Sequence, residues 1–385
     1  MIPRGLRRGM NAVLGRILTS VVQPIASPEP IVLVVRPDHL GDVLFVTPGL
    51  QWWHEHVPGY RLALAIGPWS HDVVAYHPAV DTVLEIPFPG FTRQRHHRVS
   101  AYTMLLHYAR QLRHLRPVAA VLLRDDHWWG AWLTQQAGIP IRIGADHPLI
   151  RPFLTHPIQL TGQHWVQRNV ALLTATAEIL GVASPPVSAT PTTMPLAWFG
   201  PTDASTAAQA LLRALGINRP FIVLHPGAGV PVKYWPALRW ATLARLLNQA
   251  GYTVLITGTR AEQSLVEMVA RIAGPDTIAC AGKTTVPVLA EVLRQAALVV
   301  GPDTGPLHIA VAVGTPTVHL FGPSNAASFG PWGDSQVHRV VHAGWQCRHC
   351  ENLSPGRRTA GCLTALSVSR VAEVCFDVLD HAKPA

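Results

Sequence analysis

The sequence predicts an α/β protein made of two doubly wound domains, each with a parallel sheet. Strand-like and helix-like patterns alternate in both halves, which is typical of βαβ units. The strand segments are short, continuous apolar runs, as expected for a sheet that is covered on both faces. A length of 385 residues also favours two domains over one.

The first half predicts a domain over residues 31–185, after a basic extension at 1–30. Ile31 to Val35 is a β-rich apolar run that suits the first strand of a parallel sheet. Further strands are expected at 62–66, 82–86, 118–123 and 141–143, and helices near 43–56, 69–76, 101–115, 128–137 and 166–181.

The second half repeats this alternation over residues 219–345. A segment rich in Pro, Ser and Thr precedes it, so that residues 186–218 are expected to be a linker. Strands are predicted at 221–224, 253–257, 277–280, 298–300 and 317–321, and helices at 235–249, 260–273, 286–296 and 306–313. Residues 346–385 form a Cys-containing segment with a last helix at about 367–380, which we expect to pack on the first domain.

Composition indicates a soluble globular protein with acidic partners. Hydrophobic residues make up 48% of the chain and charged residues 14%, and the formal net charge is +9. Such a balance favours nucleotide phosphates or anionic lipid head groups as partners. Nucleic acid is not expected, because no basic motif with interleaved aromatic residues stands out. No apolar run reaches the length of a membrane span.

The basic extension carries arginines at positions 4, 7, 8 and 16 between apolar residues at helical spacing. It lacks the long apolar core of a signal peptide, so a cytoplasmic protein is expected. Two interpretations stay open: a disordered or packing extension, and a helix that lies on the anionic surface of the inner membrane.

The stretch from Leu298 to Gly322 predicts a phosphate site. A buried strand ends in the turn 301–305, and a helix begins at Pro306, a residue that the first helical position tolerates. Asp303, Thr304, Gly305 and His308 therefore cluster where an open α/β sheet places ligands, beside helix amides that suit a phosphate.

Four stretches together resemble glycosyltransferase family 9, the ADP-heptose:lipopolysaccharide heptosyltransferases. They are VLVVRPDHLGDVLFVTPGL at 32–50, IVLHPGAGVPVKYWP at 222–236, GKTTVPVLAEVL at 282–293 and GPDTGPLHIAVAVGTPTVHLFG at 301–322. The resemblance implies a GT-B architecture, with two Rossmann-like domains that face each other across a cleft. It also implies an inverting transfer without a required metal or other cofactor, from ADP-heptose or a related nucleotide-sugar to a lipopolysaccharide inner-core acceptor.

Asp42 matches the family's catalytic base in its Leu-Gly-Asp turn. An inverting transfer needs a group that removes the proton from the attacking hydroxyl. Its place at a helix N-terminus is expected to stabilise the carboxylate, which keeps it ionised near neutral pH and weakens it as a base. A simple capping role is the alternative, and Asp38 is the rival carboxylate.

The donor side follows from the same resemblance. Lys233 matches the phosphate-contacting lysine, and positive charge or amides are what a leaving diphosphate needs. The small residues Ala228 and Gly229 leave room for the diphosphate. Lys283 and Thr284 match the segment beside the base, and Glu262 is placed to hold the ribose.

On the acceptor side, Arg93, Arg95 and Arg98 lie in a basic loop. Their guanidinium groups suit the carboxylates and phosphates of the family's acceptors. A solvated charged loop is the alternative.

Four cysteines near the C-terminus leave a structural zinc or iron ion open: Cys347, Cys350, Cys362 and Cys375. A branch of the family that modifies autotransporter proteins binds iron through such cysteines. Free thiols are the alternative for these cysteines.

Three rival functions stay open. One is a heptosyltransferase of the autotransporter-modifying kind, with an acceptor protein. The others are a non-catalytic nucleotide-sugar-binding protein and a nucleotide-sugar epimerase.

Overall fold

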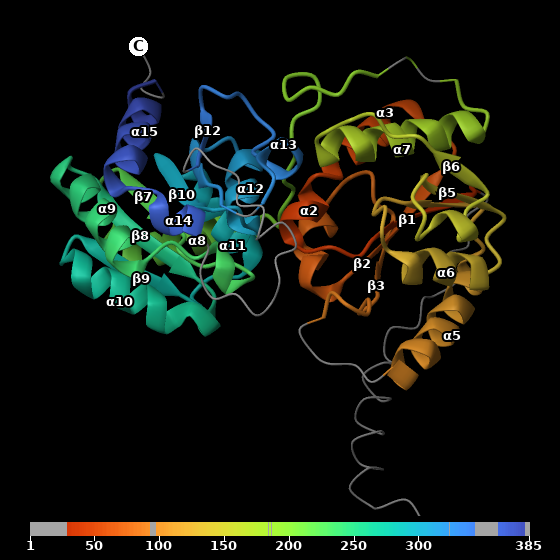
Figure 1. Ribbon diagram of the computed structural model, residues 1–385, viewed down its shortest axis with the longest axis horizontal. Helices are drawn as coiled ribbons and strands as arrows, with labels where there is room; N and C mark the ends of the chain where they lie inside the picture. The colour runs from red at the N-terminus through yellow and green to blue at the C-terminus, as the bar shows by residue number, and fades with distance from the viewer. Residues whose placement is uncertain are drawn as a thin grey trace, which may run out of the picture.

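The computed structural model describes residues 29–92, 98–183, 185, 187–322, 324–342 and 361–381. Within them, two six-stranded sheets form two domains that lie side by side (Figure 1). Every strand pairing in both sheets is parallel. This confirms the α/β class and the doubly wound sheets that the sequence predicts.

The N-terminal sheet has the strand order β3-β2-β1-β4-β5-β6. Its strands are β1 (Ile31–Arg36), β2 (Arg61–Ile66), β3 (Thr82–Glu85), β4 (Ala119–Leu122), β5 (Ile141–Ala145) and β6 (His156–Ile158). Its α-helices are α2 (Leu40–Leu44), α3 (Thr47–His56), α4 (His71–Val74), α5 (Arg98–Leu115), α6 (Trp128–Gln136) and α7 (Trp165–Ile179). The short edge strand β6 was not expected from the sequence.

The C-terminal sheet has the order β12-β11-β10-β7-β8-β9, which is the same topology. Its strands are β7 (Phe221–Leu224), β8 (Thr253–Gly258), β9 (Thr277–Ala281), β10 (Leu298–Pro302), β11 (Thr317–Leu320) and β12 (His338–Val341). Its α-helices are α8 (Asp203–Ala214), α9 (Ala237–Gln249), α10 (Gln263–Ala273), α11 (Val286–Arg294), α12 (Gly305–Ala312), α13 (Ala326–Phe329), α14 (Gly361–Ala365) and α15 (Val368–His381). Short 3₁₀ turns precede several of these elements, at 68–70, 151–153, 231–233 and 260–262.

Two expectations about the connections were wrong. The range 186–218 is not only a linker, because α8 lies in it and packs on α11. The last helix, α15, packs on α9 and on β10, β11 and β12 of the C-terminal domain, not on the first domain. Its apolar face explains this, since Val371, Cys375 and Val378 are buried in the core of that domain.

The two domains meet through α2 and α12, which contact each other directly (Figure 1). A small apolar cluster lies at the same junction, with Phe45 and Trp165 from the first domain and Val311 and Trp332 from the second. In both domains the switch in strand order lies between the first and fourth strands, which is where open α/β sheets bind ligands. In the described part of the chain, no helix combines the length and the apolarity needed to cross a bilayer.

Candidate active site

Asp42 lies in the first turn of α2, directly after the turn that follows β1. The sequence predicts a single helix over 43–56, but the structure has α2 and α3 in its place. Pro48 explains the break, since it lacks an N–H and sits in the first turn of α3. The Thr47 hydroxyl donates to the carbonyl of Leu44 (2.8 Å), which closes the end of α2.

The pKa of Asp42 is raised to about 6. Burial is the largest cause, and the nearby Asp38 carboxylate comes next, while Arg36 lowers it. The helix N-terminus alone would have lowered the pKa, so the expected direction was wrong. Even so, a carboxyl with a pKa of about 6 is mostly ionised at neutral pH and is well matched to accept a proton there.

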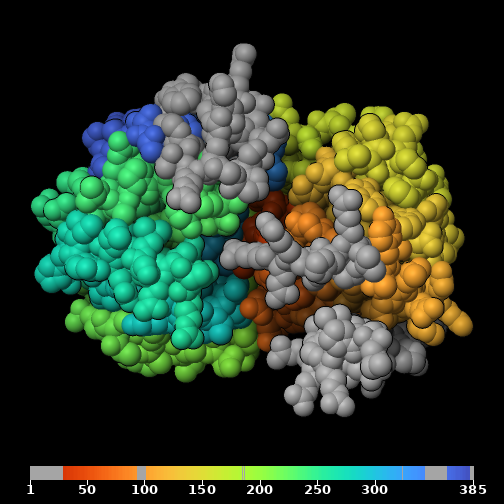
Figure 2. All heavy atoms as spheres, turned by 60° about the horizontal axis from the view of Figure 1, so that its bottom comes forward, coloured from red at the N-terminus to blue at the C-terminus, as the bar shows by residue number. Residues whose placement is uncertain are grey.

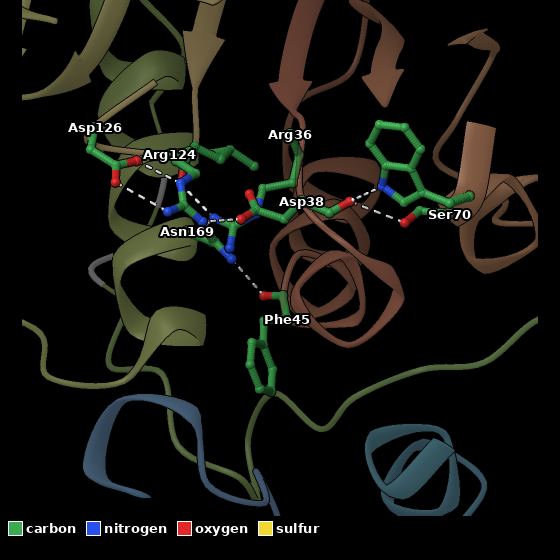
Figure 3. Close-up of polar contacts among 9 residues, drawn as sticks. Arg36, Asp38, Phe45, Ser70, Arg124, Asp126 and Asn169 are labelled. Atoms are coloured by element: carbon green, nitrogen blue, oxygen red, sulfur yellow. Dashed lines mark hydrogen bonds and ion pairs between the residues drawn. The ribbon is translucent and has the colours of Figure 1, made fainter. Parts of the chain in front are cut away.

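Asp38 is held by two arginines and is therefore a poor rival for the role of base (Figure 3). It is 1% exposed, and its Oδ2 lies 2.8 Å from Arg36 Nε, while its Oδ1 accepts from Arg124. Its carbonyl accepts from Trp69 Nε1 (2.8 Å) and the Ser70 hydroxyl (3.1 Å). Such a buried, doubly paired carboxylate fixes the turn that leads into α2.

Arg36 and Arg124, which sequence reasoning did not identify, anchor this turn to the rest of the domain. Arg36 is fully buried, donates to the carbonyl of Leu123 (2.5 Å) and lies 4.8 Å from the centre of the Trp165 ring. Asn169 connects the same network to α2, because its amide donates to the carbonyl of Phe45 (2.9 Å) (Figure 3). Leu123 and Trp165, which Arg36 contacts, are far from it in the sequence. The only sequence signal for this network is an arginine at the end of a strand.

Lys233, Asp303 and His308 form a second cluster at the carboxyl ends of β7 and β10. Lys233 Nζ lies 2.6 Å from Asp303 Oδ2 and 3.2 Å from its carbonyl oxygen. His308 Nε2 lies 3.3 Å from Asp303 Oδ1. Burial by itself would raise the pKa of Asp303, but Lys233 and His308 outweigh it and hold that pKa well below its usual range. Asp303 therefore orients Lys233 and His308. The positive charge of Lys233 and of the N-terminus of α12 can attract an anion to this place.

Thr304 and Gly305 form the N-terminus of α12 beside this cluster. Thr304 is the N-cap in an extended conformation, and its side chain makes no capping hydrogen bond. The first amides of a helix have no partner within the helix and carry partial positive charge, so they suit a phosphate oxygen.

The Asp42 turn and the α12 N-terminus touch across the domain junction. A Cβ atom placed on Gly41 would lie 2.8 Å from His308 Cδ2 and 3.3 Å from Gly305 Cα. The rings of Phe45 and His308 are also edge to face, with centroids 4.8 Å apart. The fold thus brings Asp42, Gly305 and His308 together from opposite halves of the chain.

The other expected donor residues lie at the carboxyl ends of strands in the same sheet. Ala228 is buried and Gly229 is exposed in the loop after β7, and a Cβ on Gly229 would meet nothing within 4 Å. Lys283 is exposed and Thr284 half-buried after β9. All four residues therefore lie at the same edge of the C-terminal sheet as Lys233 and Asp303.

Glu262 follows β8 and already has local partners. Its Oε2 accepts from the amide (2.7 Å) and the hydroxyl (2.8 Å) of Thr259. A Cβ on Gly227 would lie 2.0 Å from Glu262 Oε1, so a larger residue there would displace the Glu262 carboxylate. His225, in the same region, is buried and has a lowered pKa, and its Nδ1 lies 3.0 Å from the Thr257 hydroxyl. Glu262 therefore shapes the loop, and contact with a ribose stays a prediction.

Several expected residues lie outside the described part of the chain, namely Arg93, Arg95, Cys347 and Cys350. Arg98 begins α5, and its side chain is not described. Cys362 and Cys375 are buried, and burial raises the pKa of the Cys375 thiol well above its ordinary value. Among the residues that the structure describes, no group of three or more His, Cys, Asp or Glu is placed to hold a metal ion. The metal hypothesis stays a prediction that depends on residues 343–360.

Comparison with known proteins connects this geometry to one family. The model of glycosyltransferase family 9 (heptosyltransferase) matches residues 108–355. The lipopolysaccharide heptosyltransferase 1 of Pseudomonas aeruginosa is 28% identical over 330 residues, which cover 83% of this chain and 85% of the relative.

Two solved structures have a similar fold. The crystal structure of a family 9 glycosyl transferase from Veillonella parvula has a TM-score of 0.76 and 23% identity, and the match covers 93% of this chain and 100% of that one. The E. coli ADP-heptose lps heptosyltransferase II has a TM-score of 0.70 and 20% identity, with 91% and 98% covered. The two-domain GT-B architecture expected from the sequence is thereby confirmed.

Proposed function

The chain belongs to glycosyltransferase family 9, and we propose that it transfers a heptose from ADP-heptose to a hydroxyl of a lipopolysaccharide inner-core acceptor. Relatives that span most of the chain are named lipopolysaccharide heptosyltransferases, which supports both the donor and the acceptor class. The cluster at the C-terminal sheet supports a donor with a diphosphate, because Lys233 and the N-terminus of α12 present positive charge there.

The observation that carries this proposal is the contact between the Asp42 turn and α12. Gly41 and Gly305 let the two helix ends approach so closely that added Cβ atoms would overlap with His308 and Leu40. A carboxylate that can accept a proton is thus placed beside the end of the site that would hold the diphosphate. A nucleotide-sugar bound at α12 would put its anomeric carbon near Asp42.

In the proposed reaction, Asp42 is the general base. It takes the proton of the acceptor hydroxyl while that oxygen attacks the anomeric carbon, and the bond from this carbon to the phosphate oxygen breaks. A single displacement inverts the anomeric centre. Lys233 and the amides of α12 stabilise the negative charge that develops on the leaving ADP, so the transfer does not require a metal ion.

The test is the variant Asp42→Asn, which keeps the shape and removes the base. We expect kcat to fall by about 10²- to 10⁴-fold, the usual contribution of general base catalysis, while the Kd for ADP-heptose stays nearly unchanged. Turnover is measured as ADP release with a purified core acceptor, and binding by calorimetry.

The matched control is Asp203→Asn, because Asp203 is an exposed carboxylate in the first turn of α8. It should leave kcat and Kd at wild-type values. Retained turnover in Asp42→Asn would contradict the role of base. Binding of UDP-sugars in place of ADP-heptose would contradict the donor, and turnover of donor without acceptor would indicate an epimerase.

A further inference from the structure

Helix α5 carries exposed apolar side chains beside the face that it buries against the core. Leu105, Tyr108 and Leu112 are buried in the cluster that α5 shares with α6 and the sheet. On the flank of this face, Tyr102 and Leu106 are each 54% exposed. A surface helix of a globular protein normally carries polar residues outside its core-facing stripe, so two large apolar side chains exposed one turn apart are a feature of this surface that the core does not require.

Two tryptophans of α6 extend this exposed face. Trp128 is 46% exposed and stacks on Trp132, with ring centroids 6.3 Å apart. Trp132 in turn lies edge to face with Tyr102 at 5.8 Å. Tyr102, Leu106, Trp128 and Trp132 therefore form one continuous surface, which we name the α5–α6 apolar patch.

Positive charge lines the α5–α6 apolar patch. Arg110 follows Leu106 by four residues, on the same side of the helix, and both Arg110 and Arg113 are exposed. The sequence of α5 contains no Asp or Glu. Asp125 and Asp126, which precede α6, pair with Arg168 (3.5 Å) and Arg124 (2.5 Å). The patch is thus apolar and aromatic with a cationic border.

The position of the patch suits a membrane acceptor. Helix α5 projects from the lower edge of the N-terminal domain, below α6 (Figure 1). Figure 2 looks at this lower side of both domains. The segment that leads into α5 starts after β3, at the same sheet edge as the Asp42 turn.

We propose that the α5–α6 apolar patch docks on the surface of an anionic lipid bilayer. Trp and Tyr side chains are the ones that membrane interfaces favour, and exposed arginines are attracted to an anionic leaflet. The inference rests on the proposed function to the extent that a glycolipid acceptor lies in such a bilayer. Pairing of two copies through this patch would bring two cationic helices together, which charge repulsion opposes.

The experiment is co-sedimentation of the full chain with vesicles of phosphatidylglycerol and phosphatidylcholine, and with vesicles of phosphatidylcholine alone. We expect the wild type to bind the anionic vesicles and to be released by salt. The triple variant Tyr102→Ser/Leu106→Ser/Trp128→Ser should lower the partition coefficient by about tenfold, because it removes the apolar area that would enter the interface.

The matched control is Leu238→Ser/Met268→Ser, which removes exposed apolar residues of the other domain that are 65% and 46% exposed. It should change the partition coefficient by less than about twofold, since this surface lies outside the proposed contact. Circular dichroism of both variants checks that the fold is retained. Equal vesicle binding by the triple variant, equal loss in the control, or no binding by the wild type each overturns the proposal. A change in mass by light scattering in the triple variant also overturns it, because the patch would then join protein copies.

Turnover with a delipidated, soluble core saccharide separates this inference from the proposed function. The triple variant should keep wild-type turnover there, because none of its residues belongs to the donor or base cluster. If the proposed function is wrong, soluble turnover fails in the wild type while the difference in vesicle binding remains. If the docking inference is wrong, turnover remains and the difference in vesicle binding disappears.

Discussion

At the scale of single residues, the sequence identified the Asp42 turn and the Lys233–Asp303 region, but not what surrounds them. The resemblance placed Asp42 in a helix-start turn, and the structure has it in the first turn of α2. The sequence could not reveal that Asp38 pairs with both Arg36 and Arg124. Arg36 is 2 residues away, but Arg124 is 86 residues away, and only the fold brings it to Asp38. The pKa of Asp42 depends first on its burial and then on such through-space neighbours, and the sequence shows neither, so the direction of the shift was predicted wrongly.

The raised pKa of Asp42 predicts the pH dependence of the reaction. The base must be ionised to accept a proton, so activity should be lost as the pH falls through about 6, where Asp42 becomes protonated. We expect kcat/KM to rise about tenfold per pH unit below that value and to level off above it. The pKa of Asp303 is held low, so this carboxylate stays ionised across the same range.

The measurement is kcat/KM between pH 4.5 and 8, with the Kd for ADP-heptose followed in parallel. The Kd should change little in this range, which separates proton transfer from donor binding. An acid limb with an apparent pKa near 4 would mean that the pKa of Asp42 is not raised in the folded protein. If the acid limb of the kcat/KM profile is also present in Asp42→Asn, the titrating group is a different residue.

At the scale of elements, the apolar runs predicted most strands and helices of both sheets, because buried parallel strands leave a clear signal. They failed where a few residues decide the structure. Pro48 divides one expected helix into α2 and α3. The edge strands β6 and β12 are short and only partly buried, so their patterns are weak. The contact of α2 with α12 is formed by glycines, which carry no apolar signal at all.

This contact predicts the effect of Gly41→Ala. The added methyl group would lie 2.8 Å from His308 Cδ2 and 3.3 Å from Gly305 Cα, so the His308 ring and the start of α12 must shift relative to the Asp42 turn. A displacement on the order of 1 Å between reacting groups costs about 10²-fold in rate, and we expect kcat to fall by that order.

Gly49→Ala is the matched control, because its Cβ would lie 2.6 Å from Leu173 Cδ1, inside the first domain. Overpacking of this kind costs about 1–3 kcal/mol, so both variants should lose thermal stability. Only Gly41→Ala should lose turnover as well. Comparable kcat in the two variants would show that the approach of α2 to α12 is not needed for the reaction.

At the scale of the whole molecule, alternation of strands and helices was enough to predict two doubly wound domains. It was not enough to place α8 and α15, since an amphipathic helix shows that it has an apolar face but not which surface covers it. Both helices join the C-terminal domain. The junction between the domains is likewise invisible in sequence. His164, the N-cap of α7, and Gly330 near α13 are 166 residues apart, and their Nε2 and carbonyl oxygen lie 3.1 Å from each other.

Buried histidines across both domains predict that acid destabilises the fold. His77, His127, His164 and His338 are each at most 9% exposed, and burial, the largest cause in each case, lowers their pKa values to about 4. The unfolded chain binds these protons near pH 6.5, so between about 6.5 and 4 the unfolded state binds more protons than the folded one. Each histidine then lowers the free energy of unfolding by up to about 1.4 kcal/mol per pH unit as the pH falls. Asp42 acts in the opposite direction, because its pKa is raised, but one group cannot offset four.

The free energy of unfolding should therefore be greatest above pH 6.5 and decrease steadily toward pH 4, as measured by urea denaturation at several pH values. His77→Asn keeps an acceptor for the amide of Ala79, which now donates to His77 Nδ1 (3.2 Å), and removes one titrating group. It should make the decrease measurably less steep, whereas the exposed His114→Gln should leave it unchanged. Constant stability over this range in the wild type, or the same slope in His77→Asn, would show that these rings do not stay neutral in the folded protein. His164 lies at the domain junction, whereas the other three histidines lie within single domains. A single cooperative unfolding transition at every pH would therefore show that the two domains unfold together.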